Sequence, residues 1–259
     1  MKLAVDIGNT TTTVGRPRDG YFEFVHKFPT KKFNAPEDLW QHWCQSIDLL
    51  TAREGIDLFL ASVVPGLTEL VKKREDEFNN LCILEYPWPE TALEVVVDSP
   101  ATVGADRIAA ASAFYEEYGP GIVVDFGTAT TVEAILPGGK YAGGVIMPGV
   151  EATFGGLFNK TAALPRITPE LPREFKCDTT EDSLQCGIYY GLAGAVERAV
   201  EELNNKFKLP SDSAVVATGG RGAEFMTLTE VLTAYDEQLV LKGIMICCGS
   251  NFILDIEKK

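Results

Sequence analysis

The sequence predicts an α/β protein made of two duplicated domains, each a mixed sheet flanked by helices. Three observations lead to this fold class. The segment VDIGNTTT at 5–12 returns as VDFGTATT at 124–131, with five of eight positions identical. Each copy opens a run of three strand-like segments separated by turns. In both halves, alternating helical and strand-like stretches follow, which is typical of an α/β layer.

The strand-like segments contain β-branched or alternating apolar residues, and Gly or Pro lies between them. Spacing of apolar residues distinguishes the helices from buried strands. Three-strand runs are expected at 3–7, 10–15 and 21–28 and at 121–126, 129–136 and 140–147, with helices at 34–50, 66–80, 104–118, 183–207 and 221–228 and strands at 56–62, 81–86 and 214–217. No Pro/Ser-rich linker separates the halves, so we expect domains 1–112 and 113–259 around an interdomain nucleotide cleft.

Composition excludes several classes of protein. The 259 residues are 46% hydrophobic, which excludes disordered, collagen-like and coiled-coil chains. A net charge of −14 repels phosphate backbones and anionic lipids, so no nucleic-acid or membrane partner is expected. The six cysteines form no CxxC pair and the sequence has only two histidines, so no zinc site is expected. The opening segment reaches Asp6 after three apolar residues, too few for a signal peptide, and we expect a cytoplasmic protein.

The repeated segment carries residue types suited to binding phosphate. Asp6 and Asp125 each lie near the end of a predicted strand, and Gly8 and Gly127 let backbone N–H groups approach an anion. A carboxylate tolerates a phosphate only with a cation between them, so these aspartates imply a metal if the anion belongs to a nucleotide. One such turn alone is commonly just a β-turn, whereas two in equivalent halves favour a functional interpretation.

No Walker A or Rossmann glycine pattern is present, since the glycine turns lead into strands. Phosphate would therefore be held by hairpins. This arrangement is similar to the ribonuclease H-like fold of the acetate and sugar kinase, actin and heat-shock chaperone superfamily, in which two duplicated domains clamp ATP.

From Asp6 almost to the C-terminus, the chain resembles the type III pantothenate kinases. The order and spacing of several short motifs carry this resemblance. They are DIGNT at 6–10, SVVP at 62–65, GADR at 104–107, DFGTATT at 125–131, GGVIMPG at 143–149, LP at 164–165 and TGG at 218–220.

The resemblance implies ATP-dependent phosphorylation of pantothenate, the first step toward coenzyme A. It places Asp6 beside Mg²⁺ and the triphosphate, and gives Asp125 a monovalent cation, K⁺ or NH₄⁺. The implied ATP contacts are Asp6, Ile7, Gly8, Asn9 and Thr10 in the first turn, Gly127, Thr128, Ala129 and Thr130 in the second, and Thr218, Gly219 and Gly220 on the adenosine side.

The substrate end of the site is assigned to Gly104, Ala105, Asp106 and Arg107. Asp106 is the expected general base, because a carboxylate can orient the hydroxyl and accept its proton as the bond to phosphorus forms. Arg107 can bind the pantothenate carboxylate bidentately. Taken alone, this segment is more typical of an acidic first turn of a helix, and only the other motifs favour the functional interpretation. Family members are homodimers with the substrate pocket at the interface, and Thr180 resembles the contributing position.

Two departures from the family pattern and two alternatives stay open. Val97 stands near the place where many bacterial members have Tyr, and Glu133 stands where Asp is usual. The alternatives are a catalytically silent metabolite- or nucleotide-binding regulator and another small-molecule phosphotransferase or a phosphatase, each on the same fold. The retained acidic residues argue against the first, and the GADR and GGVIMPG motifs against the second.

Overall fold

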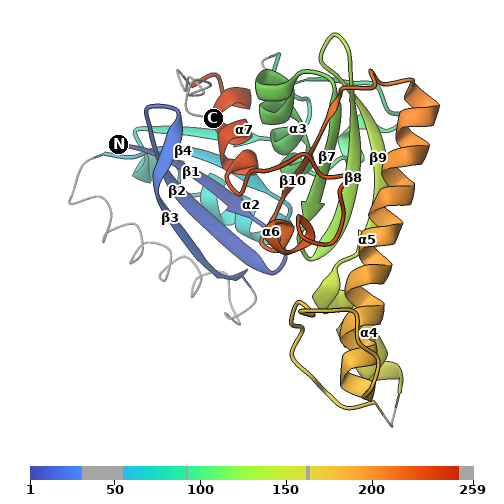
Figure 1. Ribbon diagram of the computed structural model, residues 1–259. Helices are drawn as coiled ribbons and strands as arrows, with labels where there is room; N and C mark the ends of the chain where they lie inside the picture. Colours follow the sequence, from blue (N-terminus) through green and yellow to red (C-terminus); the bar gives the residue numbers. More distant parts are fainter. Residues whose placement is uncertain (31–54, 91–92, 162–163, 251–259) are drawn as a thin grey trace. The chain divides into compact units, whose positions relative to one another are not determined.

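The computed structural model describes residues 1–30, 55–90, 93–161 and 164–250 (Figure 1). The chain divides into two compact units, Met1–Glu117 with Gln238–Lys259, and Tyr118–Glu237. This division differs from the expected domains 1–112 and 113–259. Helix α3 (Ala105–Tyr118) continues through residue 112, and helix α7 (Leu239–Cys247) packs against the sheet of the first unit. The helix expected at 34–50 lies outside the described residues.

The first unit contains a five-stranded mixed sheet in the order β3-β2-β1-β4-β5. Neighbouring strands β1, β2 and β3 are antiparallel, and β4 and β5 run parallel to β1. Strand β2 extends beyond its expected end because a register irregularity between Arg16 and Pro17 accommodates the proline. The strand bounds are β1 Lys2–Ile7, β2 Thr11–Arg18, β3 Tyr21–Pro29, β4 Asp57–Ser62 and β5 Asn80–Leu84.

Helices α2 (Pro65–Lys72), α3 and α7 belong to this unit. Helix α2 is shorter than the expected 66–80, because a 3-10 turn at Glu75–Glu77 places acidic side chains where a helix C-terminus disfavours them. Helix α7 carries one charged residue, Lys242, whose Nζ lies 3.3 Å from Glu117 Oε2. Short elements at Glu94–Val95 (β6) and Pro100–Thr102 (η3) precede α3.

The five strands of the second unit follow the order β11-β10-β7-β8-β9. Strands β7, β8 and β9 form an antiparallel run, and β10 and β11 are parallel to β7 and to each other. This is the topology of the first unit, so the predicted duplication and α/β class are confirmed. The strand bounds are β7 Gly121–Phe126, β8 Ala129–Leu136, β9 Lys140–Pro148, β10 Ala214–Thr218 and β11 Ala234–Tyr235.

Three helices complete the second unit: α4 (Val150–Lys160), α5 (Thr180–Phe207) and α6 (Gly222–Phe225). The long helix α5 packs on β8, and α4 packs against α5 (Figure 1). Helix α5 begins three residues earlier than expected because Thr179 caps it, accepting a hydrogen bond from the Asp182 N–H at 3.0 Å. Tyr189 and Val196 of this helix and Ile122 of β7 are fully buried in the core of the unit.

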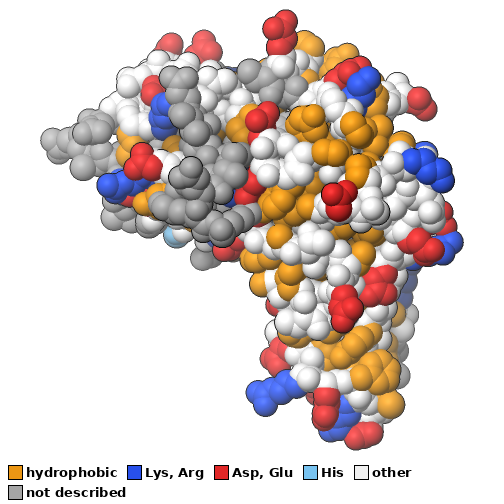
Figure 2. All heavy atoms as spheres, turned by 45° about the horizontal axis from the view of Figure 1, so that its top comes forward, with side chains coloured by type: hydrophobic (Ala, Val, Ile, Leu, Met, Phe, Trp, Pro, Cys, Tyr) orange, Lys and Arg blue, Asp and Glu red, His pale blue; other side chains and the backbone are white. Residues whose placement is uncertain are grey.

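Charged side chains are dispersed over the face seen in Figure 2, where Lys and Arg lie as separate spots among Asp and Glu. Within the described part of the chain, no helix has both the length and the apolar character needed to cross a membrane.

Candidate nucleotide and substrate site

The first predicted phosphate turn connects β1 to β2 in the first unit. Ile7 and Thr12 are the last paired residues of the hairpin, and the Gly8 N–H donates a hydrogen bond to the Thr11 carbonyl at 3.0 Å. A Cβ on Gly8 would lie 2.9 Å from that oxygen, so the tight turn favours glycine. Asn9 and Thr10 at the tip are exposed and therefore accessible to a ligand.

Asp6 lies one residue before the end of β1. It is paired with Thr13 on β2 and with Ala61 on β4, and its Oδ1 atom is buried. The half-buried carboxylate thus stands at the C-terminal end of a parallel strand pair, the edge at which open α/β sheets commonly bind ligands. A carboxylate oxygen is the ligand type that Mg²⁺ prefers, so Asp6 fits the predicted cation.

The start of α3 is joined to the same edge of this sheet. The Val63 N–H, just after β4, donates to the Ile7 carbonyl at 3.0 Å, and Gly104 lies beside the Val63 side chain. Asp106 Oδ1 accepts a hydrogen bond from the Arg107 N–H at 2.8 Å. A Cβ on Gly104 would collide with that same carboxylate oxygen, so glycine here permits the placement of Asp106. Asp106 and Arg107 are both half-buried.

The second predicted phosphate turn connects β7 to β8 in the second unit. Phe126 and Thr130 are the last paired residues, and the Gly127 N–H donates to the Ala129 carbonyl at 3.1 Å. Helix α4 begins against this turn, because the Gly149 N–H donates to the Thr128 carbonyl at 3.2 Å. A Cβ on Gly149 would lie 2.7 Å from that carbonyl oxygen, so the close approach requires glycine.

The glycine turn after β10 packs beside Asp125. Thr218 is directly opposite Asp125 in the parallel β7–β10 pair, which places both side chains on one face of the sheet. Gly219 has φ +85°, and a Cβ there would lie 2.7 Å from the Phe126 carbonyl carbon. The Tyr235 hydroxyl donates to the Gly219 carbonyl at 3.2 Å. Burial, reinforced by nearby carboxylates, raises the pKa of Tyr235 to about 12 and keeps this donor protonated.

Two threonine hydroxyls in this region are buried without a hydrogen-bond partner among the described residues. They belong to Thr130 and Thr218, and each residue is 1% exposed. A buried hydroxyl without a partner costs free energy. The Thr218 hydroxyl, on the same sheet face as the Asp125 carboxylate, gives an oxygen-rich environment of the kind that hard cations prefer.

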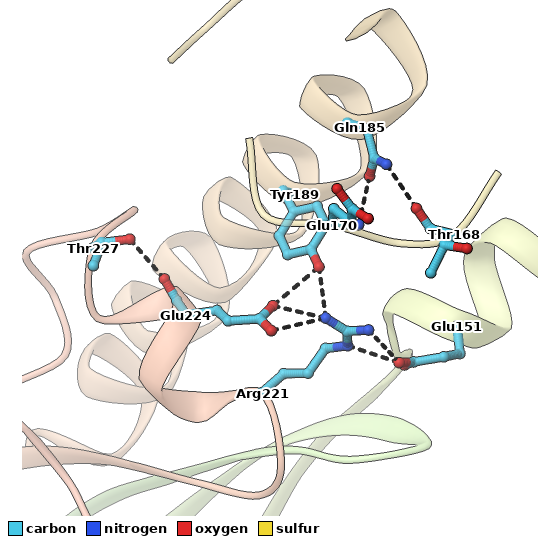
Figure 3. A network of polar contacts seen from close by, with 8 residues as sticks. All are labelled: Glu151, Thr168, Glu170, Gln185, Tyr189, Arg221, Glu224 and Thr227. Atoms are coloured by element: carbon cyan, nitrogen blue, oxygen red, sulfur yellow. Dashed lines mark hydrogen bonds and ion pairs between the residues drawn. The ribbon is translucent and has the colours of Figure 1, made fainter. Parts of the chain in front are cut away.

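A charged network surrounds Arg221, the residue after the two glycines (Figure 3). Its guanidinium donates to Glu151 of α4 at 2.7 Å, to the Tyr189 hydroxyl of α5 at 2.7 Å and to Glu224 of α6 at 2.8 Å. The neighbouring carboxylates raise the pKa of Arg221 against the opposing effect of burial, which is the largest single influence. For Tyr189, by contrast, burial raises the pKa, so both groups keep their protons.

The sequence matches the family described as type III pantothenate kinase over residues 2–202. The chain belongs to the type III pantothenate kinase family. A type III pantothenate kinase of Halalkalibacterium halodurans is 33% identical over 97% of this chain and 100% of its own. The predicted family membership is thereby confirmed.

Solved structures show the same fold at low identity. A Baf family protein from Campylobacter jejuni is 20% identical, with a TM-score of 0.60 over 95% of this chain and 96% of its own. A ROK family glucokinase from Streptomyces griseus, solved with glucose and AMPPNP, is 14% identical, with a TM-score of 0.52 over 94% and 97% of the two chains. These likenesses support two ribonuclease H-like domains.

The structure distributes the predicted site residues of this type III pantothenate kinase family member between the two units. The first unit brings Asp6 and its turn to the edge that also holds Asp106, while the second brings Asp125 and its turn to the glycine turn. Thr180 is exposed at the first position of α5. The divergent Glu133 is buried and accepts a hydrogen bond from the Tyr141 hydroxyl at 2.6 Å.

The network around Arg221 was not expected from the sequence. Its only local signal is the three-residue spacing of Arg221 and Glu224, which suits an ion pair within one helical turn. Glu151 and Tyr189 come from distant parts of the chain, so sequence spacing cannot associate them with Arg221.

Proposed function

We propose that this protein transfers the γ-phosphoryl group of ATP to the primary hydroxyl of pantothenate, in the first step of coenzyme A biosynthesis. Family membership over residues 2–202 carries this proposal. The geometry supports it, because each unit has a glycine-containing turn preceded by an aspartate at the equivalent end of its central strand.

Both turns would bind the triphosphate of ATP through backbone N–H groups and threonine hydroxyls. In this proposal the first turn contributes Gly8, Asn9 and Thr10, and Asp6 holds Mg²⁺, which neutralises phosphate charge when bound. The second turn contributes residues 127–130, and the segment 218–220 receives the adenosine. Glycine at 219 and 220 supports that assignment, because it lets a flat ligand approach the backbone closely.

Asp125 would hold a monovalent cation, K⁺ or NH₄⁺. The buried Thr218 hydroxyl beside it supports this role, since it has no hydrogen-bond partner among the described residues and could supply a second oxygen ligand. Replacing K⁺ by Na⁺ should therefore lower the rate, and an unchanged rate would remove Asp125 from this role.

Asp106 would act as the general base. An alcohol has a pKa far above 7, so the carboxylate orients the hydroxyl and takes its proton while the bond from oxygen to phosphorus forms in line with the departing ADP. The hydrogen bond from the Arg107 N–H to Asp106 Oδ1 fixes one carboxylate oxygen. The Arg107 guanidinium would bind the carboxylate of pantothenate as a two-pronged donor.

Assembly and location complete the proposal. We propose a cytoplasmic homodimer whose substrate pocket is closed by the partner subunit. The exposed position of Thr180 at the beginning of α5 is compatible with a contact to a second copy. Analytical ultracentrifugation with and without ATP and pantothenate tests the dimer, and a monomer under all conditions would contradict it.

One assay tests the function against its alternatives. The purified protein is supplied with ATP, Mg²⁺ and K⁺, and release of ADP is followed with and without pantothenate. We expect turnover that requires pantothenate and a product that carries one added phosphate by mass spectrometry. Turnover with a sugar instead would favour another phosphotransferase. ATP binding without any turnover would favour the regulator.

A further inference from the structure

We propose that Arg221 is a positioning residue for nucleotide binding, holding the glycine turn 219–220 in place without touching the phosphates. This inference rests on the function proposed above and assigns a role to the network in Figure 3. The backbone of Arg221 already joins the turn to the central strand, because its N–H donates to the Phe126 carbonyl at 3.3 Å. The adjacent Gly222 N–H closes the turn on the Gly219 carbonyl at 3.2 Å.

The side chain of Arg221 is committed to protein partners. Nε and Nη2 both contact Glu151, and Nη1 contacts Glu224 and the Tyr189 hydroxyl. Two carboxylates surround one guanidinium, so the network carries a net negative charge. It would repel a triphosphate rather than attract one. The network therefore suits the nucleoside end of the ligand, which is where the segment 218–220 is assigned.

One partner of Arg221, Tyr189, belongs to a stack of aromatic rings. Phe225 of α6 stacks on Phe126 at a centroid distance of 4.2 Å and on Tyr189 at 5.7 Å. The Arg221 guanidinium lies 5.9 Å from the Tyr189 ring centroid. This stack connects the end of β7 to α5 and α6, while Glu151 adds the first turn of α4. A change at Arg221 would consequently loosen the glycine turn, because its anchors to α4 and α5 would be lost.

The test compares dissociation constants for ATP and AMP, measured by calorimetry on the full chain. Arg221→Ala should weaken both ligands by the same factor, about tenfold, because misplacing a binding loop affects the nucleoside part that they share. Arg221→Lys keeps the charge but cannot reach all three partners at once, so an intermediate loss is expected. In the kinetic assay, KM for ATP should rise while KM for pantothenate stays unchanged.

Arg198→Ala is the matched control. Arg198 also pairs with two glutamates, Glu201 and Glu202, but on an exposed part of α5. We expect wild-type nucleotide binding from this variant. Should Arg221→Ala fail to fold, Tyr189→Phe removes one hydroxyl, keeps the ring stack, and should still weaken ATP and AMP equally, by about threefold.

Three results would overturn the proposal. Wild-type dissociation constants in Arg221→Lys and Tyr189→Phe would show that the network does not position the turn. Weakened ATP binding with unchanged AMP binding would show a direct contact with phosphate. Equal increases in KM for both substrates would show a general structural role. A separate outcome would contradict the proposed function and not the role of Arg221: wild-type protein that binds ATP and AMP but does not phosphorylate pantothenate.

Discussion

The turn after β1 and the turn after β7 occupy equivalent places in two sheets whose five corresponding strands share one order, yet the turns differ in length and surroundings. Residues 8–11 separate the last paired residues of the first hairpin, whereas only 127–129 do so in the second. A Cβ on Gly8 would approach only the hairpin's own backbone, at Thr11. The second turn is contacted by the start of α4 at Gly149, and the glycine turn after β10 packs on the adjoining end of β7.

A duplicated hairpin can thus diverge in the length and surroundings of its turn while its strands keep their order and directions. The residues paired with the two aspartates also differ between the units. Asp125 lies between Thr131 and Thr218, whereas Asp6 lies between Thr13 and Ala61. The second unit thus offers one more hydroxyl beside its carboxylate. In the proposed function, the second unit holds the adenosine and the monovalent cation, whereas the first, which also carries Asp106, holds Mg²⁺ and supplies the general base.

We expect the greatest change in activity when the carboxylate of Asp106 or of Asp125 is replaced by an amide. Asp106→Asn should keep ATP binding but lower kcat by at least about 100-fold, because the amide keeps the shape and cannot accept the proton. Asp125→Asn should act mainly on the K⁺ concentration needed for half-maximal activity. Steady-state kinetics over a K⁺ series measures both variants. Loss of ATP binding in Asp106→Asn would assign this residue to the metal and break the comparison.

An intermediate effect should distinguish a glycine in the first turn, Gly8, from a glycine in the turn after β10, Gly219. Gly219→Ala forces a methyl group onto the Phe126 backbone at a positive φ, and should lower the free energy of unfolding by about 2–4 kcal/mol. Gly8→Ala places a methyl group 2.9 Å from the Thr11 carbonyl oxygen, at a φ that other residues adopt, so the turn must shift and the cost should be smaller, about 1 kcal/mol. Gly155→Ala, in α4 with open space around it, is the control and should stabilise slightly. Urea unfolding followed by circular dichroism ranks them, and equal losses at 219 and 8 would contradict the difference.

The smallest effect concerns alkaline pH in the second unit. The pKa of Tyr235 is about 12 in the folded protein and about 10 in an unfolded chain. Its contribution to stability is therefore complete below pH 10 and is lost as the pH rises toward 12. Tyr235→Phe should flatten the decline of the urea midpoint in this window. A decline as steep as in the wild type would show that other groups cause it.

Local sequence signals were sufficient to predict most of the fold. The meanders, α3, α5 and β10 were predicted because their apolar periodicity and flanking turn residues act locally. The helix α7 was missed, since Lys242 interrupts its apolar run and the compensating Glu117 is distant in the chain. Strand β11, at Ala234–Tyr235, is too short to carry a periodic signal.

For the candidate site, the repeat pointed to both turns but concealed their offset. In the sequence Thr12 aligns with Thr131, whereas in the sheets Asp6 is paired with Thr13 and Asp125 with Thr131. The extra residue of the first turn therefore shifts the equivalence of the following strands by one position. The sequence repeat does not reveal this shift, because Thr12 and Thr13 are both threonines. Of the two glutamates that hold Arg221, Glu151 comes from a distant helix, so tertiary packing alone reveals it.

The return of α7 to the first unit has a consequence for synthesis on the ribosome. Leu239, Ile244 and Met245 are fully buried, and Gly243 packs closely against the α3 backbone at Ala109. The amino-terminal unit can cover its sheet only after residues 118–237 have been made. The second unit is therefore synthesised completely before the first, and the two segments of the first unit come together last. A nascent protein stalled before α7 would expose the apolar surface of β1 and β4 to chaperones.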